Sequence, residues 1–104
     1  MEILKPLRGN FAGNILSDMK IGYKATFIRK FNKFEQALQE EVLEKIELFK
    51  DVKNHKQLKV HKLHGPLSGR YSFSVNYKTR IVFIFISKKE VAILSVGDHA
   101  VYDT

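Results

Sequence analysis

The sequence contains no cysteine, so the chain can form no disulfide and has neither a thiolate nucleophile nor a zinc site of the CxxC type. Acidic residues are also scarce, because 11 Asp and Glu stand against 18 Lys and Arg among 104 residues. The resulting net charge of +7 is strong for so small a chain. Such a positive field favours polyanionic partners, with nucleic acid ahead of anionic membrane.

Long hydrophobic runs are absent too. No stretch approaches the roughly 18 apolar residues of a membrane-spanning helix. The N-terminus carries charges at Glu2, Lys5 and Arg8 and lacks the apolar segment of a secretory signal. We therefore expect a cytoplasmic protein with no membrane partner.

The sequence also lacks the motifs of common cofactor sites, because it has no Walker-type loop, no GxGxxG and no HExxH. His61 and His64 have a spacing that could hold a metal ion on a helix. However, Gly65 and Pro66 follow them and disfavour a helix, and no carboxylate cluster accompanies them. We expect no cofactor and no metal.

The hydrophobic pattern predicts one domain that begins near Met19. Residues 1–18 show no helical or strand periodicity, and we interpret them as an N-terminal extension or arm. Residues 19–27 alternate as a strand does, with every second side chain apolar. From residue 29 to about residue 50 the apolar period becomes helical, and a shift in the stripe predicts two helices that break near residues 38–40.

The second half of the chain reads as strands. Residues 71–75 alternate apolar and polar side chains, as expected of a strand with one wet face, and residues 80–86 form an apolar run typical of a buried central strand. Residues 76–79 fit a tight turn between them, and residues 91–96 predict the last strand. The fold class is therefore α+β, with a helical hairpin packed on a mainly antiparallel, twisted sheet of about four strands.

An irregular loop precedes these strands. It runs from Leu63 to Gly69 and holds two glycines and a proline, so its backbone can come close to a ligand or partner. Two imidazoles placed on either side of a phosphate could take and return a proton, and an arginine could clamp the phosphate. Arg70 and Arg80 are the candidate arginines. His55 lies in a polar linker, and we expect it to have no part in the chemistry.

Three motifs occur in a characteristic order: the loop Leu63-x-Gly65-x-Leu67-x-Gly69, the strand from Thr79 to Phe83, and the closing Gly97-x-His99 with Tyr102. In this order they resemble the RelE/ParE superfamily of bacterial type II toxins. The likeness is greatest to its ribosome-dependent mRNA interferases of the RelE, YoeB and YafQ kind. The resemblance covers residues 19–104 as the toxin domain and leaves out residues 1–18.

The resemblance implies an endoribonuclease that cleaves mRNA in the ribosomal A site by attack of a ribose 2′-hydroxyl on the adjacent phosphate. His61 falls where YafQ-like toxins have a histidine and YoeB-like toxins a glutamate, so it would be the base. Arg80 matches the phosphate-stabilising arginine, and His99 matches the residue proposed as general acid. Tyr102 lies near the C-terminal aromatic that would stack on or orient a nucleotide.

The implied partners are a cognate antitoxin and the ribosome, with its 16S rRNA and A-site mRNA. RNA would be bound by a set of mostly basic residues, Lys53, Lys56, Lys59, Lys62, His64, Arg70, Ser72, Ser74 and Lys78. Departures from the family pattern leave open both the subtype and which residue acts as acid and which as base. Two serines replace basic strand residues, and Lys78 replaces an aspartate of YafQ-like toxins.

Residues 1–18 loosely resemble antitoxin tails and are read as a fused remnant or a translated upstream stretch, with Met19 as the native start. Two alternatives stay open. One is a ParE-like toxin that poisons DNA gyrase, and the other is a catalytically inactive RelE-fold module that binds nucleic acid or protein.

Overall fold

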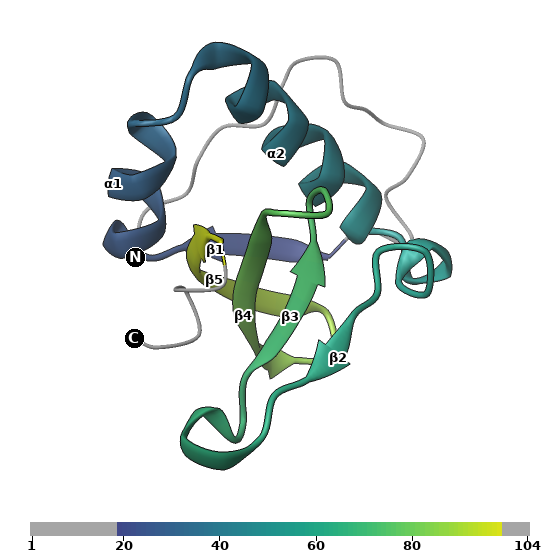
Figure 1. Ribbon diagram of the computed structural model, residues 1–104. Helices are drawn as coiled ribbons and strands as arrows, with labels where there is room; N and C mark the ends of the chain where they lie inside the picture. The colour runs from purple at the N-terminus through teal and green to yellow at the C-terminus, as the bar shows by residue number, and fades with distance from the viewer. Residues whose placement is uncertain (1–18, 99–104) are drawn as a thin grey trace.

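Two helices pack against a five-stranded sheet in this computed structural model, which describes residues 19–98 (Figure 1). The elements in chain order are β1 (Lys20–Tyr23), α1 (Ala25–Asn32), α2 (Gln36–Phe49), β2 (His61–Lys62), β3 (Tyr71–Ser74), β4 (Arg80–Ser87) and β5 (Glu90–Gly97). Two short 3-10 turns, η2 (Val52–Asn54) and η3 (Gly65–Leu67), lie before and after β2.

The strand order in the sheet is β1-β5-β4-β3-β2. Strands β2 to β5 pair antiparallel, whereas β1 runs parallel to β5. The predicted α+β class is confirmed, and β4 is the central strand, as expected. The fifth strand is the two-residue β2, whose side chains are both exposed and therefore leave no apolar pattern in the sequence.

The first helix begins earlier than the sequence pattern suggested. The strand expected over residues 19–27 ends at Tyr23, and Phe27 belongs to α1. Rings spaced four residues apart explain this, because Tyr23 lies 5.2 Å from Phe27 and Phe27 lies 5.6 Å from Phe31 between ring centroids. Four-residue spacing is the helical period, and burial of these rings outweighs the local alternation.

The break between the helices was also misplaced. It lies before α2, where Glu35 has extended backbone angles of φ −65° and ψ 159°, instead of near residues 38–40. Leu38 and Phe34 both pack against the core from partly buried positions. Their continuous contribution to the apolar stripe hid the short connection between the helices.

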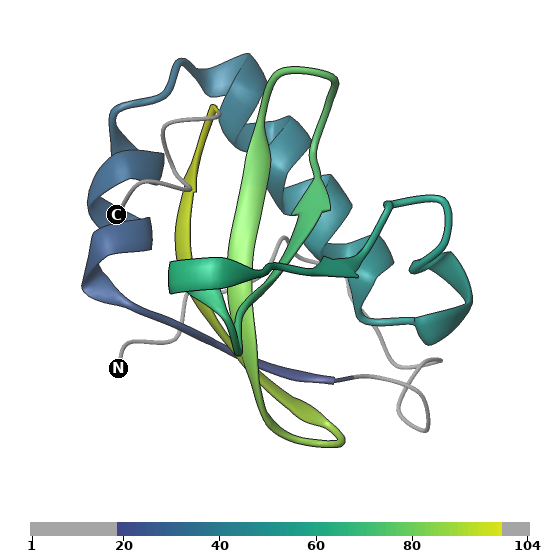
Figure 2. The ribbon, with the colours of Figure 1, turned by 60° about the horizontal axis from the view of Figure 1, so that its bottom comes forward.

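The core lies between the helices and one face of the sheet, and Figure 2 shows α2 crossing behind β4 and β3. Phe49 at the end of α2 is central to it. Its ring centroid lies 4.5 Å from that of Phe73 and 4.8 Å from that of Phe83. All three rings are fully buried, so this cluster fixes α2 to strands β3 and β4.

His55 completes the same cluster. Its imidazole stacks on Phe49 with centroids 4.6 Å apart, and its Nε2 donates to the Phe49 carbonyl oxygen at 2.8 Å. The His55 side chain therefore gives a hydrogen-bond donor to one of the carbonyl oxygens that have no partner within α2 at its C-terminal end. His55 has a structural role that the polar composition of the linker did not reveal.

Candidate active site

The strand register brings the predicted base and the predicted arginine to one face of the sheet. His61 lies opposite Ser72, Ser72 lies opposite Val82, and Ser74 lies opposite Arg80. Directly paired residues, and residues two apart on one strand, share a face. We call this set of His61, Ser72, Ser74 and Arg80 the His61 face, and it is the face opposite to the buried rings of β3.

The register of β2, β3 and β4 sets the distance between His61 and Arg80. They lie two strands apart and two residues apart along the strands, which corresponds to about 12 Å between their Cα atoms. Long side chains extend from both positions toward the same side of the sheet. The strand register thus sets the spacing of the two residues along one face of the sheet.

The exposed imidazole of His61 is fixed in one tautomer. Its Nδ1 lies 2.8 Å from the carbonyl oxygen of Lys59. A carbonyl only accepts, so Nδ1 carries the hydrogen, and Nε2 of the neutral ring is left as an acceptor. Lys59 itself has a left-handed backbone with φ 61°, which turns the chain into β2. The geometry therefore leaves Nε2 of His61 able to take a proton from a bound substrate.

Arg80 is half-buried at the start of β4, and the turn before it holds its side chain. Nη1 donates to the carbonyl oxygens of Asn76 at 2.6 Å and Thr79 at 3.2 Å. A guanidinium has five N–H donors, so Nη2 and Nε can still contact a phosphate. The arginine is thus oriented by backbone before any substrate binds.

The turn that holds Arg80 is itself anchored. The Asn76 side-chain oxygen accepts from the backbone N–H groups of Lys78 at 2.9 Å and Thr79 at 2.8 Å. The Asn76 amide nitrogen donates to the Glu41 carboxylate on α2 at 2.8 Å. Through this residue the position of Arg80 depends on helix α2.

The alternation in β3 predicted that the serines of the His61 face would be exposed to solvent. In the structure they are not. Ser72 is fully buried, and Ser74 is half-buried. Val82 and Ser95, which pair across the neighbouring strands, are only 4% exposed. The expectation of an exposed RNA-contacting hydroxyl is therefore wrong for Ser72. A small hydroxyl can be buried at low cost when it is hydrogen-bonded, which polar alternation alone does not reveal.

The predicted basic residues lie on β2, on the segment before it and on the turn before β4. Lys53 lies on η2, and Lys56 and Lys59 lie on the turn that follows. Lys62 lies on β2, and Lys78 lies in the turn before β4. All five side chains are exposed, as a phosphate-binding surface requires, whereas the predicted Arg70 is half-buried.

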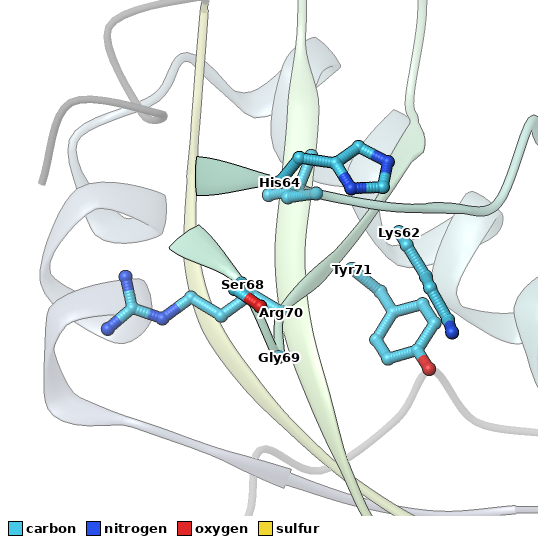
Figure 3. A pocket seen from close by; sticks show the side chains of 7 residues that line it. Lys62, His64, Ser68, Gly69, Arg70 and Tyr71 are labelled. Atoms are coloured by element: carbon cyan, nitrogen blue, oxygen red, sulfur yellow. The ribbon is translucent and has the colours of Figure 1, made fainter. Parts of the chain in front are cut away.

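The loop between β2 and β3 borders a cavity of about 400 Å³ that is open to solvent (Figure 3). Its lining residues are Lys62, Leu63, His64, Ser68, Gly69, Arg70 and Tyr71. The loop is closed by the Leu63 N–H, which donates to the Arg70 carbonyl at 2.8 Å, and it turns at Gly69, which has φ +93°. Tyr71 was missed as a site residue, because its position in an alternating strand indicated only packing.

Several expectations concern residues that the structure does not describe. His99 and Tyr102 lie outside residues 19–98, and so does the expected arm of residues 1–18. Within the described range, no three His, Asp or Glu side chains lie close enough to hold a metal ion. Neither α1 nor α2 is long and apolar enough to span a membrane.

Comparison with known proteins shows which solved structures share this fold. No protein-family profile and no curated protein sequence matches the chain. The toxin–antitoxin complex RelBE2 from Mycobacterium tuberculosis matches with a TM-score of 0.64 at 19% identity, over 79% of this chain and 99% of the other. The archaeal RelE–RelB complex from Pyrococcus horikoshii matches with a TM-score of 0.62 at 15% identity, over 78% and 94% of the two chains.

YafQ from E. coli matches with a TM-score of 0.60 at 13% identity, over 83% of this chain and 99% of the other. At such low identities the likeness is one of fold. The RelE-like fold predicted from three short motifs is confirmed.

Proposed function

We propose that this chain, which has the RelE-like fold, is the toxin of a type II toxin–antitoxin pair and an endoribonuclease that cleaves mRNA on the ribosome. The observation that supports the proposal is that His61 and Arg80 share one face of the sheet. The contact of His61 Nδ1 with the Lys59 carbonyl leaves Nε2 to accept a proton, and backbone carbonyls orient Arg80. A domain built only to bind protein has no need of this arrangement.

The structural neighbours support the toxin role and the partner. Solved neighbours include toxin–antitoxin complexes from Mycobacterium tuberculosis and Pyrococcus horikoshii. We propose a cognate antitoxin as the protein partner, and the ribosome with its 16S rRNA and A-site mRNA as the target. Both imply action in the cytoplasm. The net charge of +7 favours such a polyanionic target.

The proposed reaction needs only proton transfer and charge stabilisation. Nε2 of His61 takes the proton of a ribose 2′-hydroxyl, and the freed oxygen attacks the adjacent phosphorus. A bond from phosphorus to the 2′-oxygen forms, the bond to the 5′-oxygen of the next nucleotide breaks, and a 2′,3′-cyclic phosphate results. His99 gives its proton to the departing 5′-oxygen, Arg80 stabilises the charge that builds on the phosphate, and Tyr102 orients a nucleotide.

Single-turnover cleavage on programmed ribosomes, read by primer extension at saturating protein, tests this proposal. Arg80→Ala should lower the rate about a hundredfold or more, which is the order of 3 kcal/mol of transition-state stabilisation. His61→Ala and His99→Ala should each lower it by roughly a hundredfold, because each removes half of an acid–base pair.

Lys33→Ala serves as the control, because Lys33 is exposed in the connection between α1 and α2. Its rate should equal that of the wild type, and circular dichroism should show every variant folded. Cuts at codon-related positions support the interferase. Wild-type rates for both histidine variants would exclude the acid–base mechanism, and inhibition of DNA gyrase without RNA cleavage would favour the ParE-like alternative.

A further inference from the structure

The β2–β3 hairpin has two chemically distinct sides, and the proposed reaction uses only one. Lys62 pairs directly with Tyr71, so these side chains share a face, and the pleat places them opposite to His61 and Ser72. Figure 3 shows Lys62, His64 and Tyr71 together on one side of the loop cavity, while Arg70 points to the other side. We call the first three residues the loop pocket.

We propose that the loop pocket is a second RNA site, which binds one nucleotide of the single strand outside the bond that is cleaved. RNA as the ligand rests on the proposed function. The site itself rests on the cavity and on the side chains that line it.

The lining of the cavity suits a nucleotide. Lys62 supplies an ammonium group, His64 an imidazole and Ser68 a hydroxyl, and none of the described residues that line the cavity carries a carboxylate. These groups can donate hydrogen bonds to phosphate oxygens. The volume of about 400 Å³ lies in the range of small-molecule sites and exceeds what a phosphate alone needs. The additional space suits the base and sugar attached to that phosphate.

An aromatic surface extends from the pocket. The ring of Tyr71 stacks on Phe83 with centroids 5.5 Å apart and meets Phe85 edge-on at 5.0 Å. Phe85 is 38% exposed, so this aromatic surface reaches solvent on β4. A ring whose orientation is fixed by packed neighbours can stack on a nucleotide base. Stacking of this kind is possible with any of the four bases.

The architecture allows one strand of RNA to reach both sides. β2 is the last strand of the described sheet and contains only two residues, so no further described strand covers its outer edge. His61 and Lys62 are consecutive residues on this edge and face opposite sides. A single strand that passes around the edge could place one nucleotide at the His61 face and a neighbouring one in the loop pocket.

The test is binding of a fluorescently labelled 2′-O-methyl oligoribonucleotide, measured by anisotropy at several salt concentrations. Such an RNA has no free 2′-hydroxyl and cannot be cleaved by the proposed reaction, so binding is measured independently of catalysis. The double variant Lys62→Ala/His64→Ala should bind about tenfold or more weakly. Its plot of log affinity against log salt should be shallower by roughly 0.7 for each lost phosphate contact.

Lys33→Ala is the matched control for loss of one exposed lysine. Lys33 lies in the α1–α2 connection, which Figure 1 places at the opposite end of the molecule from the β2–β3 loop. This variant should keep the wild-type affinity within about twofold. An equal loss in both variants would mean that only overall charge matters and would overturn the pocket, as would unchanged binding by the double variant.

A second measurement locates the base. An RNA that carries 5-iodouridine should form a photo-crosslink to the tryptic peptide containing Tyr71 in the wild-type protein. Crosslinks confined to other peptides would overturn the proposal. A Tyr71 crosslink together with no ribosomal cleavage would sustain the second site while the proposed catalytic function fails.

Discussion

At the scale of single residues, the three described histidines have three different surroundings. His55 stacks on a core ring, His61 is held by one backbone carbonyl on an exposed edge, and His64 lines a cavity. An imidazole is chemically the same in each place, so its neighbours decide what it can do. The second position shares a face of the sheet with Arg80, and the third lines a cavity together with Arg70.

His55→Ala should destabilise the protein while leaving the catalytic groups in place. The change removes a stacked ring from Phe49 and a hydrogen bond to its carbonyl oxygen, which together correspond to roughly 2 kcal/mol. Urea denaturation measures this loss. His64→Ala, at an exposed position, should change the free energy of unfolding by less than about 0.5 kcal/mol. Equal stabilities of the two variants would contradict the structural role of His55.

The family resemblance proposed His61 and Arg80 as residues of one site, but the sequence pattern alone could not show that they share a face of the sheet. Their shared face depends on the register of β2, and two exposed residues carry no hydrophobic signal that fixes a register. The predicted exposure of Ser72 was wrong for a related reason. Alternation indicates which side chains share a face but not whether that face is covered. The sequence therefore predicts which residue types the candidate site contains. The pairing of the strands shows which of these residues share a face of the sheet.

At the scale of elements, the turn before β4 connects the site to a helix. The side-chain oxygen of Asn76 accepts from the backbone N–H groups of the turn, and its side-chain nitrogen donates to Glu41 of α2. Arg80 in turn donates to the Asn76 carbonyl oxygen. The turn therefore fixes the orientation of the Arg80 side chain. On the proposed function, Asn76 would therefore affect cleavage only through the position of Arg80.

Asn76→Ala should lower both stability and cleavage. It removes two acceptor bonds within the turn and the bond to Glu41, about 2 kcal/mol in sum. The cleavage rate should fall by roughly tenfold, because the carbonyls that orient Arg80 are no longer fixed.

Asn76→Asp separates these two effects. It keeps the acceptor for the turn but places a carboxylate against Glu41, so it should lose stability and retain more activity than the alanine variant. Thermal unfolding and single-turnover cleavage are the paired measurements. An unchanged rate in folded Asn76→Ala would show that the turn does not position Arg80.

The elements themselves were largely predictable. The strands over residues 80–86 and 91–96 and the turn over residues 76–79 lie where their patterns indicated, because each is a strong local signal. Both ends of α1 were misplaced, since burial of Phe27 and Phe31 in the core decided between strand and helix. Such a choice depends on residues far away in the sequence.

At the scale of the whole molecule, the buried Tyr23 couples stability to alkaline pH. Burial, and secondly the nearby Glu47, raise the pKa of its hydroxyl well above the ordinary value of 10.0. The folded protein therefore keeps this proton where the unfolded chain releases it. Stability is fully present below pH 10.0 and falls as the pH rises further, by up to about 1.4 kcal/mol per pH unit for one proton.

Denaturant unfolding between pH 8 and pH 11 checks this dependence. Tyr23→Phe should show a flatter fall in stability above pH 10, because the group that titrates is gone. Tyr77→Phe is the matched control, since Tyr77 is 90% exposed, and it should retain the wild-type slope. Identical slopes for Tyr23→Phe and the wild type would show that other groups govern alkaline unfolding.

The parallel pairing of β1 with β5 also bears on how the molecule is made. Lys20 of the first strand lies opposite Glu90 of the last, so the sheet joins the two ends of the described chain. Contacts between such distant segments close late in folding, because a long loop must be ordered before they form. During synthesis β1 emerges first and has no partner until β5 is complete. A nascent chain of this protein therefore cannot complete its sheet before β5 has emerged from the ribosome, so the pairing of β1 is among the last contacts to form.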